Sequence, residues 1–299
     1  MKKIAILTGW PWYERNIALK SVELFKKYLK REYDVFLLPE ELESFLQKRS
    51  EYEKVIPVFH WEYGEDGRIQ AFLDVLWVPY IGLSYFTNVL CMNKKEASII
   101  ASYHNISVPK EYVVHNWEKL EISQLRFWFP MIVKLNTWGS SYYTYKVQDE
   151  AELYQKIDFI RWSAIFDNIL IQEYILWEEY SISLVAWEIL KAIMFVEKNN
   201  PEDFFDYDSK YETESGMRET FPELEIELKD ALLNFAWEIK HIFWLTQGYA
   251  RIDLIVRDKQ IYFLEVNTIP WSTEVSILPK AWKLSGRNLE EFVETILKN

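Results

Sequence analysis

The chain predicts an α/β protein whose N-terminal part is a parallel sheet with helices on its faces. Over residues 1–88, short apolar stretches alternate with amphipathic stretches of helical period, a pattern typical of repeated βαβ units. We expect strands at residues 2–7, 34–39, 54–59 and 78–82, and helices at residues 17–31 and 69–76. Ligands of such sheets bind beyond the carboxyl ends of the strands, and polar residues follow two of them: Glu14 and Arg15, then His60 with Gly-Glu-Asp-Gly at 64–67.

Two further mixed units follow at residues 89–175 and 176–299, so the predicted class is α/β with an α+β remainder. No low-complexity linker or internal repeat separates the units, and we expect them to pack tightly. The predicted helices are residues 94–103, 150–160, 224–243 and 289–297, the strands are 129–134, 169–175, 180–185 and 189–196, and polar loops cover 138–141 and 199–218.

The composition predicts a cytoplasmic protein with a sizeable core. Of 299 residues, 49% are hydrophobic, and the formal net charge of -12 with a pI near 5.0 argues against nucleic acid as the main partner. A single cysteine, Cys91, fits a reducing compartment. The apolar run at residues 4–7 is too short for a signal-peptide core, and no run of about 18 apolar residues predicts a membrane span.

The most informative motif is a predicted antiparallel hairpin near the C-terminus. Residues two apart on a strand share a face, so Arg251 and Asp253 point the same way, as do Glu265 and Asn267 on the next strand. Three oxygen-bearing side chains and a guanidinium then converge, a set that suits Mg²⁺ held together with substrate phosphates. The alternative is a hairpin whose polar face is merely solvated.

Two lysines and a loop of small residues predict a polyphosphate site. Lys134 closes a strand and precedes the loop 138–141, and Lys94 opens a helix. Lysines supply point charges for phosphate oxygens, and backbone N–H groups of a small-residue loop can approach them. Taken singly, each lysine is a weak signal, because a lysine at a strand end is usually just solvated.

Two other polar segments could complete a nucleotide site. Gln172 to Ile175 follow a strand and could offer backbone groups to an adenine edge, with a carboxylate of the nearby Glu178-Glu179 pair for ribose. The long polar loop could act as a lid, in which Lys210 closes over a phosphate and Tyr211 adds a hydroxyl. A solvated acidic turn and an exposed charged loop are the respective alternatives.

In this order and at this spacing, the motifs resemble those of the D-alanine–D-alanine ligases of the ATP-grasp superfamily. The matching segments are Glu14-Arg15, His60 with Gly-Glu-Asp-Gly, Met92-Asn93-Lys94, Ile132-Val133-Lys134, Gly139-Ser140-Ser141, Phe-Asp-Tyr-Asp-Ser-Lys-Tyr at 205–211, Arg-Ile-Asp at 251–253, Leu-Glu-Val-Asn-Thr-Ile-Pro at 264–270 and Ser276-Ile277-Leu278-Pro279. The resemblance covers the chain from its start to the final helix. It implies an ATP-grasp fold behind a Rossmann-like N-terminal domain, and a homodimer.

The resemblance also implies a two-step reaction for peptidoglycan precursor synthesis. ATP phosphorylates the carboxylate of one D-alanine, and the amine of a second attacks the acylphosphate to give D-alanyl-D-alanine, ADP and phosphate. The nucleotide-binding residues it implies are Lys94, Lys134 and Lys210 for the phosphates, Gln172, Glu173, Tyr174 and Ile175 for adenine, and Glu179 for ribose. Two Mg²⁺ (or Mn²⁺) ions would be held by Asp253, Glu265 and Asn267.

The same resemblance assigns the D-alanine sites. It implies that Glu14, in a trio with Ser140 and Tyr211, binds the ammonium group of the first D-alanine, and that Arg251 stabilises negative charge on the intermediate. It further implies that Ser276 and the Ile277 backbone bind the carboxylate of the second D-alanine, and that His60 takes part in substrate binding. Relatives that form depsipeptides tend to carry Phe at the Tyr211 position. Tyr211 therefore favours an amine over a hydroxyl acceptor.

Tryptophan and glycine counts depart from the expected composition. The chain has 14 Trp and only 8 Gly, whereas Gly is ordinarily about 7% of residues. Relative to the family, Trp stands at glycine positions at residues 10, 12, 61, 77, 177, 187, 244 and 271, while Tyr143 replaces a loop glycine and Leu135 a proline. We hypothesise that most of these Trp arise from UGA codons that the source organism translates as glycine.

Two other functions remain open at this point. One is ligation of a carboxylate to a different amine acceptor by the same chemistry, which amino-acid-dependent ADP release would distinguish. The other is a non-catalytic nucleotide-binding relative whose site is blocked by Trp271 and the other surplus indoles. ATP binding without turnover in the presence of D-alanine would support the latter.

Overall fold

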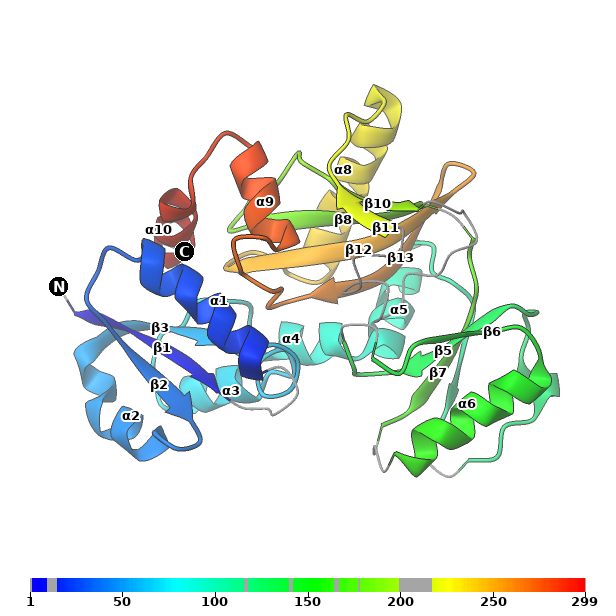
Figure 1. Ribbon diagram of the computed structural model, residues 1–299, viewed down its shortest axis with the longest axis horizontal. Coiled ribbons are helices and arrows are strands. Elements are labelled where there is room, and N and C mark those ends of the chain that lie inside the picture. Colours follow the sequence, from blue (N-terminus) through cyan, green and yellow to red (C-terminus); the bar gives the residue numbers. More distant parts are fainter. Residues whose placement is uncertain are drawn as a thin grey trace.

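The computed structural model of the chain contains three β-sheets with helices packed around them (Figure 1). It describes residues 2–9, 15–115, 118–139, 142–163, 167–176, 178–198 and 217–298. Four predicted site residues lie outside these ranges: Glu14, Ser140, Lys210 and Tyr211.

The N-terminal sheet is parallel, as the sequence predicts. Strand β1 (Lys3–Gly9) lies between β2 (Tyr33–Leu38) and β3 (Tyr52–Val58), and helices α1 (Arg15–Tyr28), α2 (Leu42–Lys48) and α3 (Arg68–Val75) surround them. The expected strand at 78–82 was wrong in extent, because only one parallel bridge forms there, between Val55 and Tyr80. Pro79 has no N–H to extend the ladder, which limits the pairing.

The middle of the chain forms an antiparallel sheet. Its strand order is β4 (Glu111–Val114), β7 (Ile169–Glu173), β5 (Met131–Leu135) and β6 (Tyr145–Val147), covered by α6 (Glu150–Trp162). Helix α6 begins at the cap residue Asp149, whose side chain accepts from the Glu152 amide, and it buries Leu153, Ile157 and Ile160 against the sheet. The sequence predicted β5, β7 and α6 but not the two shorter strands, β4 and β6.

The third sheet, which carries the predicted hairpin, has the order β11-β10-β8-β12-β13. Its strands are β8 (Glu178–Val185), β9 (Glu188–Ile189), which pairs with β8, β10 (Met194–Lys198), β11 (Met217–Thr220), β12 (Tyr249–Arg257) and β13 (Gln260–Asn267). The single strand expected at 189–196 is therefore two. Helices α4 (Tyr85–Met92) and α5 (Lys94–Tyr103) pack near β13, and α8 (Ile226–Ile242) buries Leu232 and Ile239 in the same core.

The C-terminal helices return to the N-terminal sheet. Helices α9 (Ile277–Leu284), which was not predicted, and α10 (Leu289–Lys298) lie beside α1 in Figure 1. Phe292 and Ile296 of α10 share one core with Ile4 of β1 and Phe25 of α1. Packing is thus continuous across the predicted domain boundaries, which remain a prediction. Two 3-10 turns complete the structure, at Arg49–Glu51 and Ile122–Gln124.

None of the helices in the described ranges combines the length and the apolar character needed to cross a bilayer.

Candidate active site

A cleft of about 800 Å³ lies between the middle and the third sheets, and it is also lined by α1 and by the loop before α9. Most of the site residues predicted from the sequence line it. They are Lys94, Lys134, Gln172, Glu173, Tyr174, Ile175, Glu179, Arg251, Asp253, Glu265, Asn267, Ser276 and Ile277. Segments as distant in sequence as α5 and α9 therefore meet at one cavity.

The hairpin places its four polar residues on one patch, as predicted. Across β12 and β13, Arg251 pairs with Asn267 and Asp253 with Glu265, with a bulge directly after Asp253. The Arg251 guanidinium donates to both oxygens of Asp253, at 2.8 and 2.7 Å, and the Asn267 side chain donates to Oδ2 at 2.8 Å. Ser181 on the neighbouring strand donates to Oδ1 at 2.5 Å.

This patch is electrostatically balanced by two cations. Burial opposes the charge of Arg251, yet Asp253 and Glu265 raise the pKa of its guanidinium above the ordinary value. Glu265 forms an ion pair with Lys94, Oε2 to Nζ 3.2 Å. In the part of the chain that is described, no three His, Cys, Asp or Glu side chains form a metal cluster, so Asn267 is needed to complete a set of three oxygen-bearing side chains.

Two lysines project into the cleft from different elements. Lys94 begins α5, and its Nζ also donates to the Trp138 carbonyl at 2.6 Å in the predicted phosphate loop. Lys134 lies on β5, where burial lowers the pKa of its ammonium to about 8, partly offset by the carboxylate of Glu265. Both lysines are therefore next to the carboxylate patch, which is the arrangement a polyphosphate with a divalent ion requires.

The chain matches the family model "D-ala D-ala ligase C-terminus" over residues 98–298. It is 28% identical to a D-alanine–D-alanine ligase of Bacillus anthracis over 99% of this chain and 96% of the relative, and 32% identical to one of Geotalea uraniireducens, over 99% and 94%. The chain belongs to the D-alanine–D-alanine ligase family. The crystal structure of the Bacillus anthracis ligase complexed with ATP superposes with a TM-score of 0.86 at 27% identity, covering 99% of this chain and 96% of that one.

The ligase-family comparison establishes the ATP-grasp architecture that the sequence predicted, including the parallel N-terminal sheet. The placement of the individual site residues rests on the geometry of this chain, and their roles remain predictions.

One end of the cleft is lined by the loop between β13 and α9, for which the resemblance implies binding of the second D-alanine. Ser276 is the N-cap residue of α9, and its Oγ lies 2.7 Å from Thr273 Oγ1 and accepts from the Thr273 amide at 3.2 Å. The Ile277 amide is in the first turn of the helix, where N–H groups lack intrahelical partners. This end can bind a carboxylate, as the resemblance implies.

His60 is not among the residues that line the cleft, and its role in substrate binding remains a prediction. Its ring is 1% exposed and lies between the Ser21 hydroxyl, 2.8 Å from Nε2, and the Ile269 carbonyl, 2.8 Å from Nδ1. Ser21 in turn accepts from the Ser272 amide at 3.2 Å. His60 therefore connects α1 to the loop between β13 and α9, and burial lowers its pKa to about 4.

Three acidic or basic residues near the cleft were missed by sequence reasoning. Glu65 accepts from the Ile269 and Trp61 amides, both at 3.0 Å, and so fixes the loop after β13. Lys198 pairs with Glu179 at 2.9 Å, and Glu111 lies beside Gln172. Glu65 belongs to a quoted motif, whereas no local signal distinguishes Lys198 or Glu111 from surface charges.

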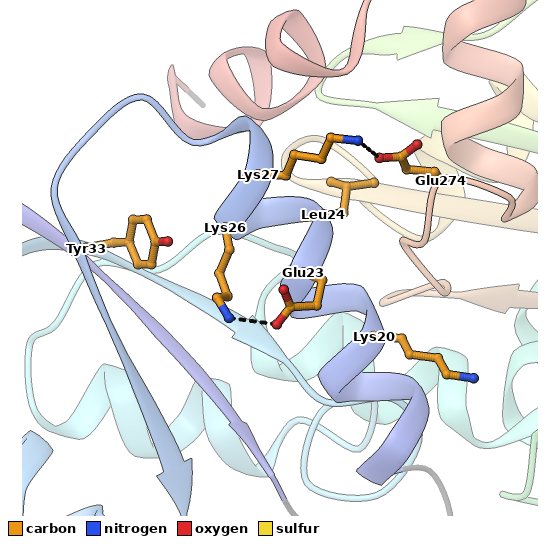
Figure 2. Close-up of a pocket in the computed structure, with 7 residues that line it drawn as sticks. All are labelled: Lys20, Glu23, Leu24, Lys26, Lys27, Tyr33 and Glu274. Carbon is orange, nitrogen blue, oxygen red and sulfur yellow. Dashed lines mark hydrogen bonds and ion pairs between the residues drawn. The ribbon is translucent and has the colours of Figure 1, made fainter.

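A second hollow of about 510 Å³ lies on the outer surface of α1 (Figure 2). Its charges are mostly paired with each other, Lys27 with Glu274 at 2.6 Å and Lys26 with Glu23 at 2.7 Å. It contains none of the predicted site residues. In Figure 2 the Lys20 side chain extends away from these pairs, and Lys20 also lines the main cleft.

Proposed function

We propose that the protein joins two D-alanine molecules to D-alanyl-D-alanine with consumption of ATP, as a cytoplasmic enzyme of peptidoglycan precursor synthesis. The observation that carries the proposal is the convergence of Lys94, Lys134 and the Arg251–Asp253–Glu265–Asn267 patch on one cleft. Full-length relatives carry the name of this activity.

The nucleotide would occupy the part of the cleft between the two sheets. Lys94 and Lys134 would hold its phosphates, and residues 172–175 and Glu179 would line the base and ribose. Lys210, outside the described residues, would reach the terminal phosphate. This assignment leaves the loop end of the cleft for the amino acids.

The oxygen set fits divalent ions, because carboxylate and amide oxygens are the donors Mg²⁺ and Mn²⁺ take beside phosphates. Asp253, Glu265 and Asn267 would hold two such ions, which would neutralise charge on the transferred phosphoryl group when bound. The chain's own cations keep the ligands in place: Arg251 orients Asp253 and Lys94 orients Glu265.

The remaining residues would bind and orient the amino acids. Glu14, in a trio with Ser140 and Tyr211, would take the ammonium of the first D-alanine, and Ser276 with the Ile277 amide would take the carboxylate of the second. Arg251 would stabilise negative charge on the carboxylate under attack, an electrostatic contribution that is usually the largest in acyl transfer. Two copies of the chain would form a dimer.

The test is release of phosphate from ATP that depends on D-alanine, with the dipeptide identified by mass spectrometry. D-Alanine-dependent turnover with dipeptide product is the expected result. Turnover only with a different amine would reassign the acceptor, and ATP binding without turnover would indicate a blocked site, for which Trp271 at the cleft wall is the specific cause. The dipeptide-to-depsipeptide ratio with D-lactate present tests the role given to Tyr211.

A further inference from the structure

Gln172 occupies an unusual place for an amide side chain. It lies in the centre of the middle sheet, where β7 pairs Gln172 with Glu111 of β4 on one side and with Ile132 of β5 on the other. Gln172 and Ile132 both line the cleft, although the exposed fraction of Gln172 is only 4%. Buried polar groups normally have hydrogen-bond partners, so the partners of the NH₂ group and of the carbonyl oxygen of Gln172 both need to be identified.

The orientation of this amide is decided by Glu111. Gln172 Nε2 donates to Glu111 Oε2 at 3.3 Å, and the same carboxylate receives Ser98 Oγ at 3.3 Å and Lys95 Nζ at 3.0 Å. The Glu111 side chain is 4% exposed. Because a carboxylate paired with a lysine only accepts hydrogen bonds, Gln172 must turn its NH₂ group toward Glu111 and its carbonyl oxygen away from it.

The carbonyl oxygen of Gln172 can therefore accept a hydrogen bond from a ligand in the cleft. No hydrogen bond to Oε1 occurs among the residues that the structure describes, whereas Nε2 is satisfied. An acceptor on the wall of a nucleotide cleft selects a base that presents a donor there. Adenine presents an exocyclic amine at position 6, and hypoxanthine and guanine present an oxygen at the same position.

We propose that Glu111, held by Lys95 and Ser98, is a positioning residue that fixes the Gln172 amide so that the cleft selects a 6-amino purine over a 6-oxo purine. The proposal rests on the proposed function in one respect, that a purine nucleotide occupies this cleft. It adds the determinant of base choice, which lies in a residue that does not itself line the cavity.

The experiment compares the binding of ATP and inosine triphosphate by calorimetry, with Mg²⁺ and without D-alanine. These nucleotides differ at position 6 of the base, which is an amine in ATP and an oxygen in inosine triphosphate, and in the hydrogen that the 6-oxo base carries on N1. The unmodified protein should prefer ATP. In Glu111→Gln, residue 111 can donate as well as accept, so Gln172 can reverse its amide, and the ATP preference should fall by roughly five- to tenfold, the value of one hydrogen bond.

Two further variants make the result decisive. Gln172→Leu should bind the two nucleotides equally, and this outcome does not depend on the folding of the Glu111 variant. Glu121→Gln removes the same charge from an exposed pair with Lys119 and should leave the preference unchanged. A Glu111→Gln or Gln172→Leu protein that binds nucleotide and keeps the full preference would overturn the proposal.

The outcome is separable from that of the proposed function. Binding is measured without the amino acid, so a protein that prefers ATP and loses the preference in Glu111→Gln supports the base-selection proposal even if no dipeptide forms. Conversely, dipeptide synthesis with equal use of both nucleotides by the unmodified protein would overturn base selection and leave the ligase function intact.

Discussion

The Arg251 guanidinium holds both carboxylate oxygens of Asp253, at 2.8 and 2.7 Å, on the same face of strand β12. Such a two-point contact fixes the carboxylate plane more firmly than a single ion pair does. The neighbouring Glu265 is held by Lys94 at 3.2 Å. Each proposed metal-binding carboxylate is therefore oriented by a cation of the chain itself.

Replacing Glu265 by Gln should abolish ADP formation while leaving the fold intact. The change keeps the shape of the side chain but removes the charge that a divalent ion needs, whereas Lys94 and Lys134 remain to bind ATP. We expect turnover to fall by at least ~100-fold, as for loss of a major electrostatic contribution, with only a partial loss of ATP affinity. Phosphate release measures the turnover, calorimetry measures the ATP affinity, and circular dichroism checks that the fold is intact.

The control for that substitution is Glu188→Gln, which removes a charge from the exposed pair with Arg287 and should keep full turnover. If Glu265→Gln retains normal turnover with unchanged Mg²⁺ dependence, the metal assignment is incorrect.

ATP affinity should depend on pH through Lys134. Burial lowers the pKa of this ammonium to about 8, so its positive charge is present at pH 7 and is lost as the pH rises through 8. Affinity for ATP should therefore decline between pH 7.5 and 9.5. Lys134→Arg keeps its charge throughout this range, because the guanidinium pKa exceeds 12, and its affinity should vary less. If the ATP affinities of the two proteins vary with pH in the same way, the assignment of Lys134 to ATP binding is incorrect.

His60 should influence acid stability more than substrate affinity. Its pKa is lowered by burial to about 4 from 6.5, so the unfolded chain takes up the proton first as the pH falls. The folded state then loses stability between pH 6.5 and 4, by an amount on the order of 3 kcal/mol. In His60→Gln this loss should be absent, and urea unfolding at pH 7 and pH 4.5 would show it.

A substrate-binding role for His60 makes a different prediction for the same variant. A large rise in the KM for D-alanine, with the pH dependence of unfolding unchanged, would support the role implied by the family resemblance. A small change in KM with a flattened stability profile would support the structural role seen here.

The sequence could predict the hairpin and its facing residues because the two-residue period of a strand is a local property. Arg251, Asp253, Glu265 and Asn267 were placed correctly without knowledge of the rest of the chain. The strand β4 was not found, because four residues carry too little periodicity, and the helix α9 was not found although it is as long as the predicted helix α3. The bulge after Asp253 also has no local signal.

Contacts between distant segments explain what the sequence could not show. His60 and the Ile269 carbonyl, which are hydrogen-bonded, lie 209 residues apart in the sequence, and the hydrogen-bonded Gln172 and Glu111 lie 61 residues apart. Both pairings depend on which strands and loops become neighbours, a property of the assembled fold. The sequence therefore identified Gln172 as a candidate but gave no reason to consider Glu111, which sets its orientation.

The backbone supports the hypothesis that surplus tryptophans replace glycine. Of the family glycine positions occupied by Trp, residues 61, 77, 187, 244 and 271 are described, and Trp61, Trp77 and Trp244 have φ of 65°, 55° and 51°. Tyr143, at another family glycine, has φ of 54°. A bulky residue in this left-handed region is a rare outlier, whereas glycine adopts it without penalty.

Trp77→Gly and Trp244→Gly should therefore each stabilise the protein. Their side chains are 92% and 56% exposed, so little packing is lost, and relief of the left-handed backbone is worth ~1–2 kcal/mol each. Trp237→Gly is the matched control: this Trp is 55% exposed within α8, where glycine should instead destabilise by up to ~1 kcal/mol. Urea unfolding of the three variants shows whether each substitution raises or lowers the free energy of unfolding.

Random mutation would scatter glycine's replacements over many residue types rather than Trp alone, so the coding DNA should carry UGA at most of the family glycine positions. UGG codons there, or destabilisation by both Trp77→Gly and Trp244→Gly, would contradict the hypothesis.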